Sequence, residues 1–89
     1  MIRRNNEIND VLIFRIDANY LIDKGDKLCK TIDDWNASNG CESFTTTFII
    51  EEHLGDLIVD YSFDEINKDK IEKLTKQILE RFDITYILI

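Results

Sequence analysis

Apolar and polar residues alternate in three separate stretches of the chain, and this period of two predicts β-strands. In the first stretch every second residue from Leu12 to Ile22 is apolar, and the positions between them turn polar at Arg15. The other stretches run from Ser43 to Glu52 and from Asp56 to Phe63, with a hairpin turn at His53-Leu54-Gly55 between them. We therefore expect a long, bent first strand and a later hairpin. The inward positions of the hairpin strands are Phe44, Thr46, Phe48, Ile50, Leu57, Val59, Tyr61 and Phe63.

The first predicted helix follows a turn at Asp23-Lys24-Gly25-Asp26. Asp26 is its expected N-cap, because a carboxylate there accepts hydrogen bonds from free N–H groups of the first turn. The helix runs to about Ala37 and packs an apolar stripe, Trp35 included, against the sheet. A helix that begins near Tyr20 is the alternative, disfavoured because Gly25 would lie in its interior.

The second predicted helix begins at a capping box formed by Ser62 and Glu65. It ends at Phe82, and the apolar segment Ile84–Ile89 that follows predicts a terminal strand. The buried stripe of this second helix, at helical spacing, is Ile71, Leu74, Ile78 and Phe82.

The order of these elements, βαββαβ, predicts a ferredoxin-like α+β sandwich that spans residues 1–89 as one domain. In this fold a four-stranded antiparallel sheet has the first and third strands at its centre and both helices on one face. The composition, 44% hydrophobic and 33% charged, is typical of a folded domain rather than a disordered chain.

The sheet face that the helices leave uncovered is more apolar than expected for a monomer. Ile87 and Ile89 lie on the terminal strand at a sheet edge, with no charged residue after Asp83 to protect that edge. The sequence therefore predicts a homodimer or a partner bound on this face. The isoleucines assigned to it are Ile13, Ile49, Ile58, Ile87 and Ile89.

Acidic residues are concentrated between Thr31 and Asn67, where nine carboxylates occur without any Lys or Arg, in a chain of net charge -7. Aromatic residues interleave with them, which indicates a folded acidic surface rather than a charged tail. Such a surface repels phosphate backbones and attracts basic proteins, so we expect a protein partner with a basic surface and no direct nucleic-acid binding. The predicted contact residues are Glu51, Glu52, Asp56, Asp60 and Asp64.

Residues suited to catalysis or metal binding are few. His53 is the sole histidine and falls in a predicted turn, and adjacent strand residues such as Glu51 and Glu52 point to opposite faces, which disfavours a metal site. Cys29 fits a helix core, whereas Cys41 follows a turn and is expected to be exposed. We expect no enzyme activity, no cofactor and no metal.

These features predict a small acidic modulator or inhibitor that docks on a basic site of a larger protein, in its most specific form as a nucleic-acid mimic. The alternative is a dimeric module that binds a small molecule and has a regulatory role. No apolar run is long enough to span a bilayer, and polar residues follow the basic Arg3-Arg4, so a cytoplasmic location is expected. The Ile-, Asn- and Lys-rich composition is typical of low-GC bacteria and their phages.

Overall fold

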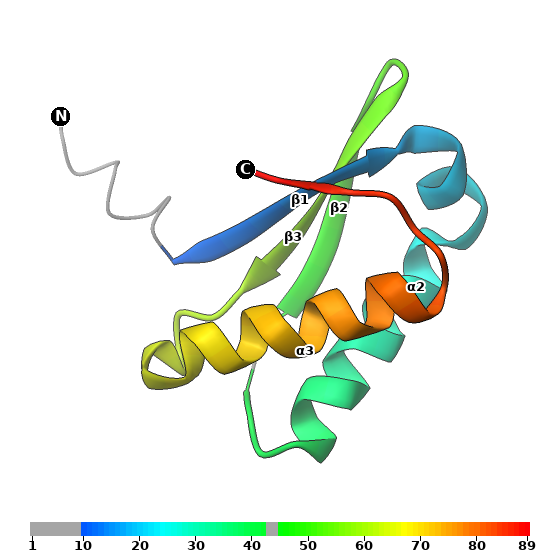
Figure 1. Cartoon of the computed structure of the whole chain (residues 1–89). Coiled ribbons are helices and arrows are strands. Elements are labelled where there is room, and N and C mark those ends of the chain that lie inside the picture. Colours follow the sequence, from blue (N-terminus) through cyan, green and yellow to red (C-terminus); the bar gives the residue numbers. More distant parts are fainter. Residues whose placement is uncertain (1–9, 43–44) are drawn as a thin grey trace, which may run out of the picture.

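The structure is a computed structural model that describes residues 10–42 and 45–89. Its strands and helices form an α+β fold in which helices and strands are mixed along the chain (Figure 1). A 3₁₀ helix, η1 (Glu65–Asn67), directly precedes the last α-helix. In chain order the other elements are β1 (Val11–Asp17), α2 (Ala18–Ser38), β2 (Thr45–Glu51), β3 (Leu54–Asp60), α3 (Lys68–Arg81) and β4 (Ile87–Leu88).

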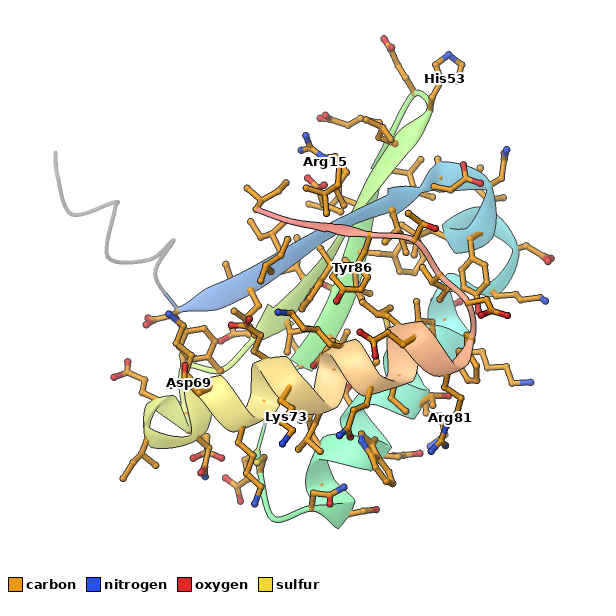
Figure 2. The ribbon with its side chains drawn as sticks, viewed as in Figure 1. Arg15, His53, Asp69, Lys73, Arg81 and Tyr86 are labelled. Atoms are coloured by element: carbon orange, nitrogen blue, oxygen red, sulfur yellow. The ribbon has the colours of Figure 1, made fainter. Side chains whose placement is uncertain are left out.

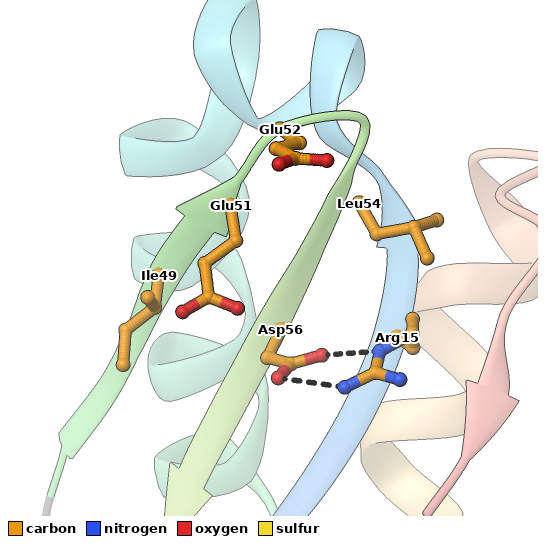
Figure 3. A pocket seen from close by; sticks show the side chains of 6 residues that line it. All are labelled: Arg15, Ile49, Glu51, Glu52, Leu54 and Asp56. Atoms are coloured by element: carbon orange, nitrogen blue, oxygen red, sulfur yellow. Dashed lines mark hydrogen bonds and ion pairs between the residues drawn. The ribbon is translucent and has the colours of Figure 1, made fainter.

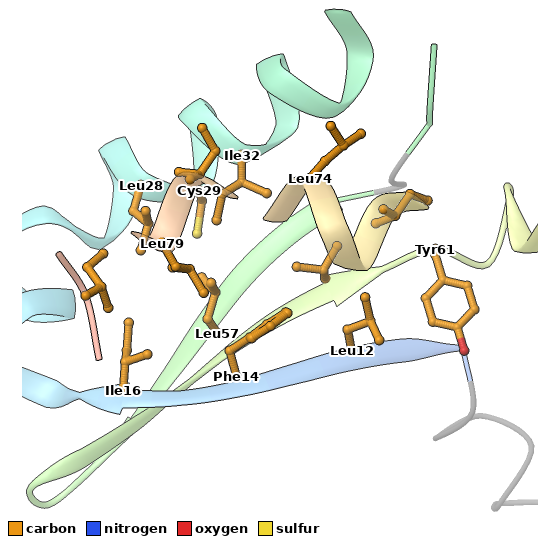
Figure 4. Packing of buried hydrophobic residues seen from close by; sticks show 14 of the residues in the cluster. Leu12, Phe14, Ile16, Leu28, Cys29, Ile32, Leu57, Tyr61, Leu74 and Leu79 are labelled. Carbon is orange, nitrogen blue, oxygen red and sulfur yellow. The ribbon is translucent and has the colours of Figure 1, made fainter. Parts of the chain in front are cut away.

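The four strands form one antiparallel sheet in the order β2-β3-β1-β4. The prediction that the first and third strands are central is therefore confirmed. Both helices pack on the same face of this sheet, and α2 lies mainly over the edge strand β2 (Figure 4). The β1–β3 register sets Phe14 opposite Leu57, and the β2–β3 register sets Phe48 opposite the same leucine.

The core lies between this sheet face and the two helices (Figure 4). Alternate residues of the central strands point into it, and Phe14 also contacts Tyr86 edge-to-face with ring centroids 5.5 Å apart. Full burial of one Leu, Ile or Phe side chain stabilises a fold by about 1.5–3 kcal/mol. The largest fully buried apolar residues are Phe14, Ile16, Leu21, Leu28, Ile32, Leu57, Val59, Ile71, Ile78 and Leu79.

The predicted long first strand is wrong, because β1 ends at Asp17 and α2 begins at once. The Asp17 carboxylate accepts a hydrogen bond from the Asn19 N–H at 3.3 Å and so caps the helix in place of Asp26. Beyond this cap the buried positions change from a period of two to helical spacing. They are Ala18, Leu21, Gly25, Leu28, Cys29, Ile32 and Asn36. The alternative helix that begins near Tyr20 is thus close to the observed one.

The predicted turn at Asp23–Asp26 is instead a kink inside α2. Lys24 has non-helical backbone angles, φ −131° and ψ 15°, and the helix continues on both sides of it. Gly25 is buried against β2, where a Cβ atom would lie 2.6 Å from the Phe48 ring. This contact with Phe48 explains why a glycine, which costs about 1 kcal/mol in a helix relative to alanine, lies within α2.

Trp35 lies at the contact between the two helices. Its indole Nε1–H donates to Gln77 Oε1 at 3.2 Å, and the Arg81 guanidinium lies 5.5 Å from its ring centroid. The side chain is half-buried and packs against the core. Since both of these partners are on α3, we assign Trp35 to the helix–helix contact rather than to the sheet.

The third strand ends earlier than predicted, and this corrects the assignments of Phe63 and Ser62. β3 ends at Asp60, so the alternation stops after buried Tyr61, and Phe63 is 71% exposed instead of inward. The predicted capping box is also wrong, because the Ser62 N–H donates to the Asp60 carboxylate at 2.9 Å within a turn. No side-chain cap is present at the start of either η1 or α3.

The ends of the remaining elements also differ from the prediction. The predicted start of the second strand, at Ser43 and Phe44, lies outside the described residues. Phe82 is the C-cap of α3 and is exposed, and Leu79 takes its expected place in the core. β4 is only two residues long, because the Ile84 N–H bonds back to the Leu79 carbonyl at 2.9 Å and Ile84 therefore belongs to the turn after α3.

We predict that Gly55→Ala destabilises the fold. A methyl group there would press against buried Leu21 and lie 3.2 Å from the Ile49 carbonyl oxygen, so the free energy of unfolding should fall by about 1–3 kcal/mol. Urea denaturation measures this change. Thr47→Ala, at an exposed position of the neighbouring strand, is the control and should lower the free energy by less than about 1 kcal/mol. A Gly55→Ala variant as stable as the parent would contradict the close approach of α2 to β3.

Candidate functional site

The sheet face opposite the helices carries a mixture of polar and apolar side chains, with Arg15 on the side away from α3 (Figure 2). Within the described part of the chain, no helix packs on it. We call this surface the open face. Its residues, which alternate with the buried ones along each strand, are Val11, Ile13, Arg15, Asp17, Thr45, Thr47, Ile49, Glu51, Leu54, Asp56, Ile58, Asp60, Ile87 and Ile89.

The strand register arranges the predicted sheet-face isoleucines in two rows that cross the sheet. One row contains Ile89, Ile13, Ile58 and Thr47, and the next contains Ile87, Arg15, Asp56 and Ile49. Ile49, Ile87 and Ile89 are 55%, 66% and 62% exposed, whereas Ile13 and Ile58 are half-buried. All five isoleucines therefore lie on the open face, and their role as a dimer or partner surface stays a prediction.

An ion pair occupies the middle of the second row. Arg15 donates from Nε to Asp56 Oδ1 at 2.8 Å and from Nη2 to Oδ2 at 3.2 Å, which is the two-pronged geometry that suits a guanidinium and a carboxylate. This hydrogen bonding and the charge of Asp56 raise the pKa of Arg15. Asp56 is therefore neutralised within the chain. Arg15 was not among the residues that the sequence assigned to the site.

A hollow of about 660 Å³ adjoins this ion pair at the hairpin end of the open face (Figure 3). Within the described ranges, no salt bridge joins Glu51 or Glu52 to a cation. Leu54, assigned to a turn by sequence, is a strand residue that is 51% exposed at this position. The hollow thus combines two carboxylates that form no salt bridge, Glu51 and Glu52, with exposed apolar surface. The residues that line it are Arg15, Ile49, Glu51, Glu52, Leu54 and Asp56.

The other two predicted acids lie apart from this hollow. Asp60 is at the far end of β3, and its carboxylate accepts a hydrogen bond from the Ser62 N–H. Asp64 lies beyond the strand, where its carboxylate accepts from the Glu42 N–H at 2.8 Å and from the Asn67 side-chain amide. The regular row of Asp56, Asp60 and Asp64 is therefore not formed, because β3 ends before Asp64.

A second hollow, which sequence analysis did not find, lies between the first half of α2 and the end of α3. It measures about 310 Å³, and the Lys24 ammonium lies 5.8 Å from the centroid of the Tyr20 ring at its wall. The exposed Phe82 side chain contributes to the same wall. This hollow is aromatic and basic, unlike the acidic hollow of the open face, and its lining residues are Tyr20, Lys24, Lys27, Leu28 and Phe82.

The histidine is exposed, and the two cysteines are buried free thiols. His53 is exposed at the tip of the β2–β3 hairpin (Figure 2). Cys29 is buried in the core as predicted, but the prediction that Cys41 is exposed is wrong. The Cys41 N–H donates to the Asn36 carbonyl at 2.9 Å, which turns the residue back toward α2. Burial raises the pKa of both thiols, that of Cys29 to about 11 with a contribution from Asp33.

Neither α2 nor α3, the two α-helices of the described residues, has the combination of length and apolar composition needed to cross a membrane. Across residues 10–42 and 45–89, no group of three or more His, Cys, Asp or Glu side chains is placed to hold a metal ion. No protein-family model, curated protein or solved structure matches this chain significantly.

We predict that burial of Cys29 makes stability depend on alkaline pH. The unfolded thiol ionises near its ordinary pKa of 9.0, whereas the folded thiol keeps its proton up to about 11. The contribution is therefore complete below pH 9 and is lost as the pH rises toward 11. Urea denaturation across this window should show a smaller loss of stability for Cys29→Ala than for the parent, since both contain the same lysines and tyrosines. Parallel curves would contradict the prediction.

Proposed function

We propose that this chain is a small non-enzymatic binding module that modulates or inhibits a larger protein by docking on a basic site of that protein. The observation that carries the proposal is the hollow at the hairpin end of the open face. It brings Glu51 and Glu52 together with exposed Ile49 and Leu54 at one end of the sheet. Protein interfaces commonly have this composition, with apolar contact area beside polar groups that set the orientation.

The chemistry of the hollow suits a lysine or arginine side chain of the partner. The aliphatic stem of such a residue would lie on Ile49 and Leu54, and its cationic head would reach the carboxylates of Glu51 and Glu52. Arg15 is hydrogen-bonded to Asp56 and is affected by Glu51 only through a weaker charge interaction, so within the described ranges these two glutamates keep negative charge that no salt bridge balances. The net charge of -7 would steer a basic partner toward the module before contact.

The most specific form of this proposal is mimicry of a nucleic acid, with carboxylates in the positions that phosphates occupy on the partner. Acids at the hairpin and Asp60 at the other end of β3 support it, since they place negative charge at both ends of one sheet face. Direct binding of a nucleic acid is disfavoured by the same charges. We also propose that the fold is of the ferredoxin-like type, which the βαββαβ order and the strand order β2-β3-β1-β4 support.

We predict that reversing the two free charges abolishes partner binding. Tagged parent protein and a Glu51→Lys/Glu52→Lys variant are used to capture proteins from a lysate of the native host, which are identified by mass spectrometry. Both glutamates are exposed, so the variant should keep the parent circular dichroism spectrum. The association rate with the captured protein should also fall steeply as salt shortens the Debye length to about 8 Å at physiological ionic strength.

A Glu65→Lys/Glu80→Lys variant is the matched control, because it makes the same charge change at exposed positions of η1 and α3. It should capture the partner as the parent does. Equal capture by all three proteins, or a captured partner that has no basic surface, would refute the proposed function. Loss of capture in both variants would show that net charge alone, rather than the hollow, is responsible.

Self-association through the β4 edge is a second candidate property, favoured by the exposure of Ile87 and Ile89 there. We predict that Ile87→Lys shifts the protein toward monomer in sedimentation velocity runs. Ile22→Lys, an equivalent change at an exposed position of α2, should leave the assembly unchanged. A parent protein that stays monomeric at high concentration would contradict this prediction. The alternative of a dimeric module that binds a small molecule stays a prediction.

A further inference from the structure

β2 forms one edge of the sheet. The backbone N–H and C=O groups of its successive residues therefore point alternately toward β3 and away from the sheet. The Tyr61 N–H donates to the Asp10 carbonyl and the Ala18 N–H to the His53 carbonyl. Tyr61 and His53 flank β3, so the odd-numbered residues of β3 bond toward β1. The even-numbered residues of β3 therefore bond toward β2, where Asp56 is paired with Ile49. It follows that the backbone N–H and C=O groups of Phe48 and Ile50 point away from the sheet.

This edge lacks the features by which proteins usually prevent strand addition. β2 is seven residues long, with the sequence TTTFIIE, and contains no Pro, Lys or Arg. An exposed edge without proline, lysine or a bulge is a ready template for another strand. The opposite edge differs, because β4 has only two residues. Among the described strands, β2 therefore offers the longer backbone for pairing.

The charges beside this edge indicate what would pair with it. Glu51 ends β2 and Glu52 follows it in the turn, so both carboxylates lie at one end of the edge, next to the hollow. An extended basic segment has the complementary charge.

We propose that a basic, extended segment of the partner adds to β2 as a further antiparallel strand of the sheet. This inference rests on the proposed function and names the form in which the partner binds. Backbone hydrogen bonds would supply affinity and alternate side chains specificity, as in other cases of strand addition. Antiparallel alignment matches every pair already in the sheet.

The geometry of an antiparallel pair predicts the pattern of the segment. Residues opposite Phe48 and Ile50 bond to β2, and their side chains lie on the helix side of the sheet. The intervening residues direct their N–H groups to solvent and their side chains to the open face, beside Ile49 and Glu51. Basic residues should therefore alternate with apolar ones, and only the amides of the apolar residues should bond to β2.

An alternating lysine–valine peptide of the same length as β2, blocked at both ends, is the probe. Two isomers of it have equal charge and composition: one is N-methylated on the valine amides and the other on an equal number of lysine amides. We expect the parent protein to bind the unmodified and lysine-methylated peptides in isothermal titration calorimetry. The valine-methylated peptide should bind at least about tenfold more weakly, because it loses the hydrogen bonds to β2.

Amide hydrogen exchange measured by NMR supplies a second readout. Exchange at Phe48 and Ile50 should slow when the unmodified peptide binds and stay fast with the valine-methylated isomer. Slow exchange at these amides in a dimer of the free protein would assign the edge to a second copy and overturn the proposal. A preference for the valine-methylated isomer would overturn the antiparallel alignment.

The two proposals fail in different ways. If both isomers bind equally and the Glu51→Lys/Glu52→Lys variant weakens both, acidic docking stands and strand addition is refuted. If that variant binds the unmodified peptide as well as the parent does, the acidic contact is refuted. If no peptide binds, strand addition is refuted, and capture of the partner from the lysate still decides the proposed function.

Discussion

The antiparallel pairing of β1 with β3 sets both faces of the sheet at once. One register places Phe14 opposite Leu57 on the helix side and Arg15 opposite Asp56 on the open face. A slip by one residue would turn every side chain of β1 to the other face, leaving Phe14 in solvent and forcing Arg15 into the core. The slipped register is strongly disfavoured, because it would bury the guanidinium and lose the burial of apolar side chains. The composition of the open face is therefore a consequence of how the core is formed.

Much of the strand arrangement could be predicted, because alternation in β1, β2 and β3 is a local pattern of the kind that a half-buried strand requires. The start of α2 could not be predicted in this way. The alternation continues by coincidence through Ala18, Tyr20 and Ile22, although Ile22 is exposed. Gly25 also argued against a helix, and the reason for its presence is a contact with the distant Phe48. Local propensity misled here because tertiary packing decided the conformation.

The candidate site was predicted only in part, for a similar reason. The acidic run is evident in the sequence, but which of its members share a hollow depends on where the hairpin turns and where β3 ends. Leu54 lies at the site because the hairpin turn is shorter than expected. Asp64 lies outside it because β3 ends earlier than expected. The pairing of Arg15 with Asp56 joins residues 41 positions apart, so it requires the register of two strands that no local pattern specifies.

Burial of both cysteines has a consequence for how the folded chain responds to oxidants. Disulfide exchange needs a thiolate that a reagent can reach, and the raised pKa and burial of Cys29 and Cys41 make such a species scarce at neutral pH. Oxidation or labelling must then wait until the helix layer opens away from the sheet. The rate at which the thiols react is thus a measure of that opening.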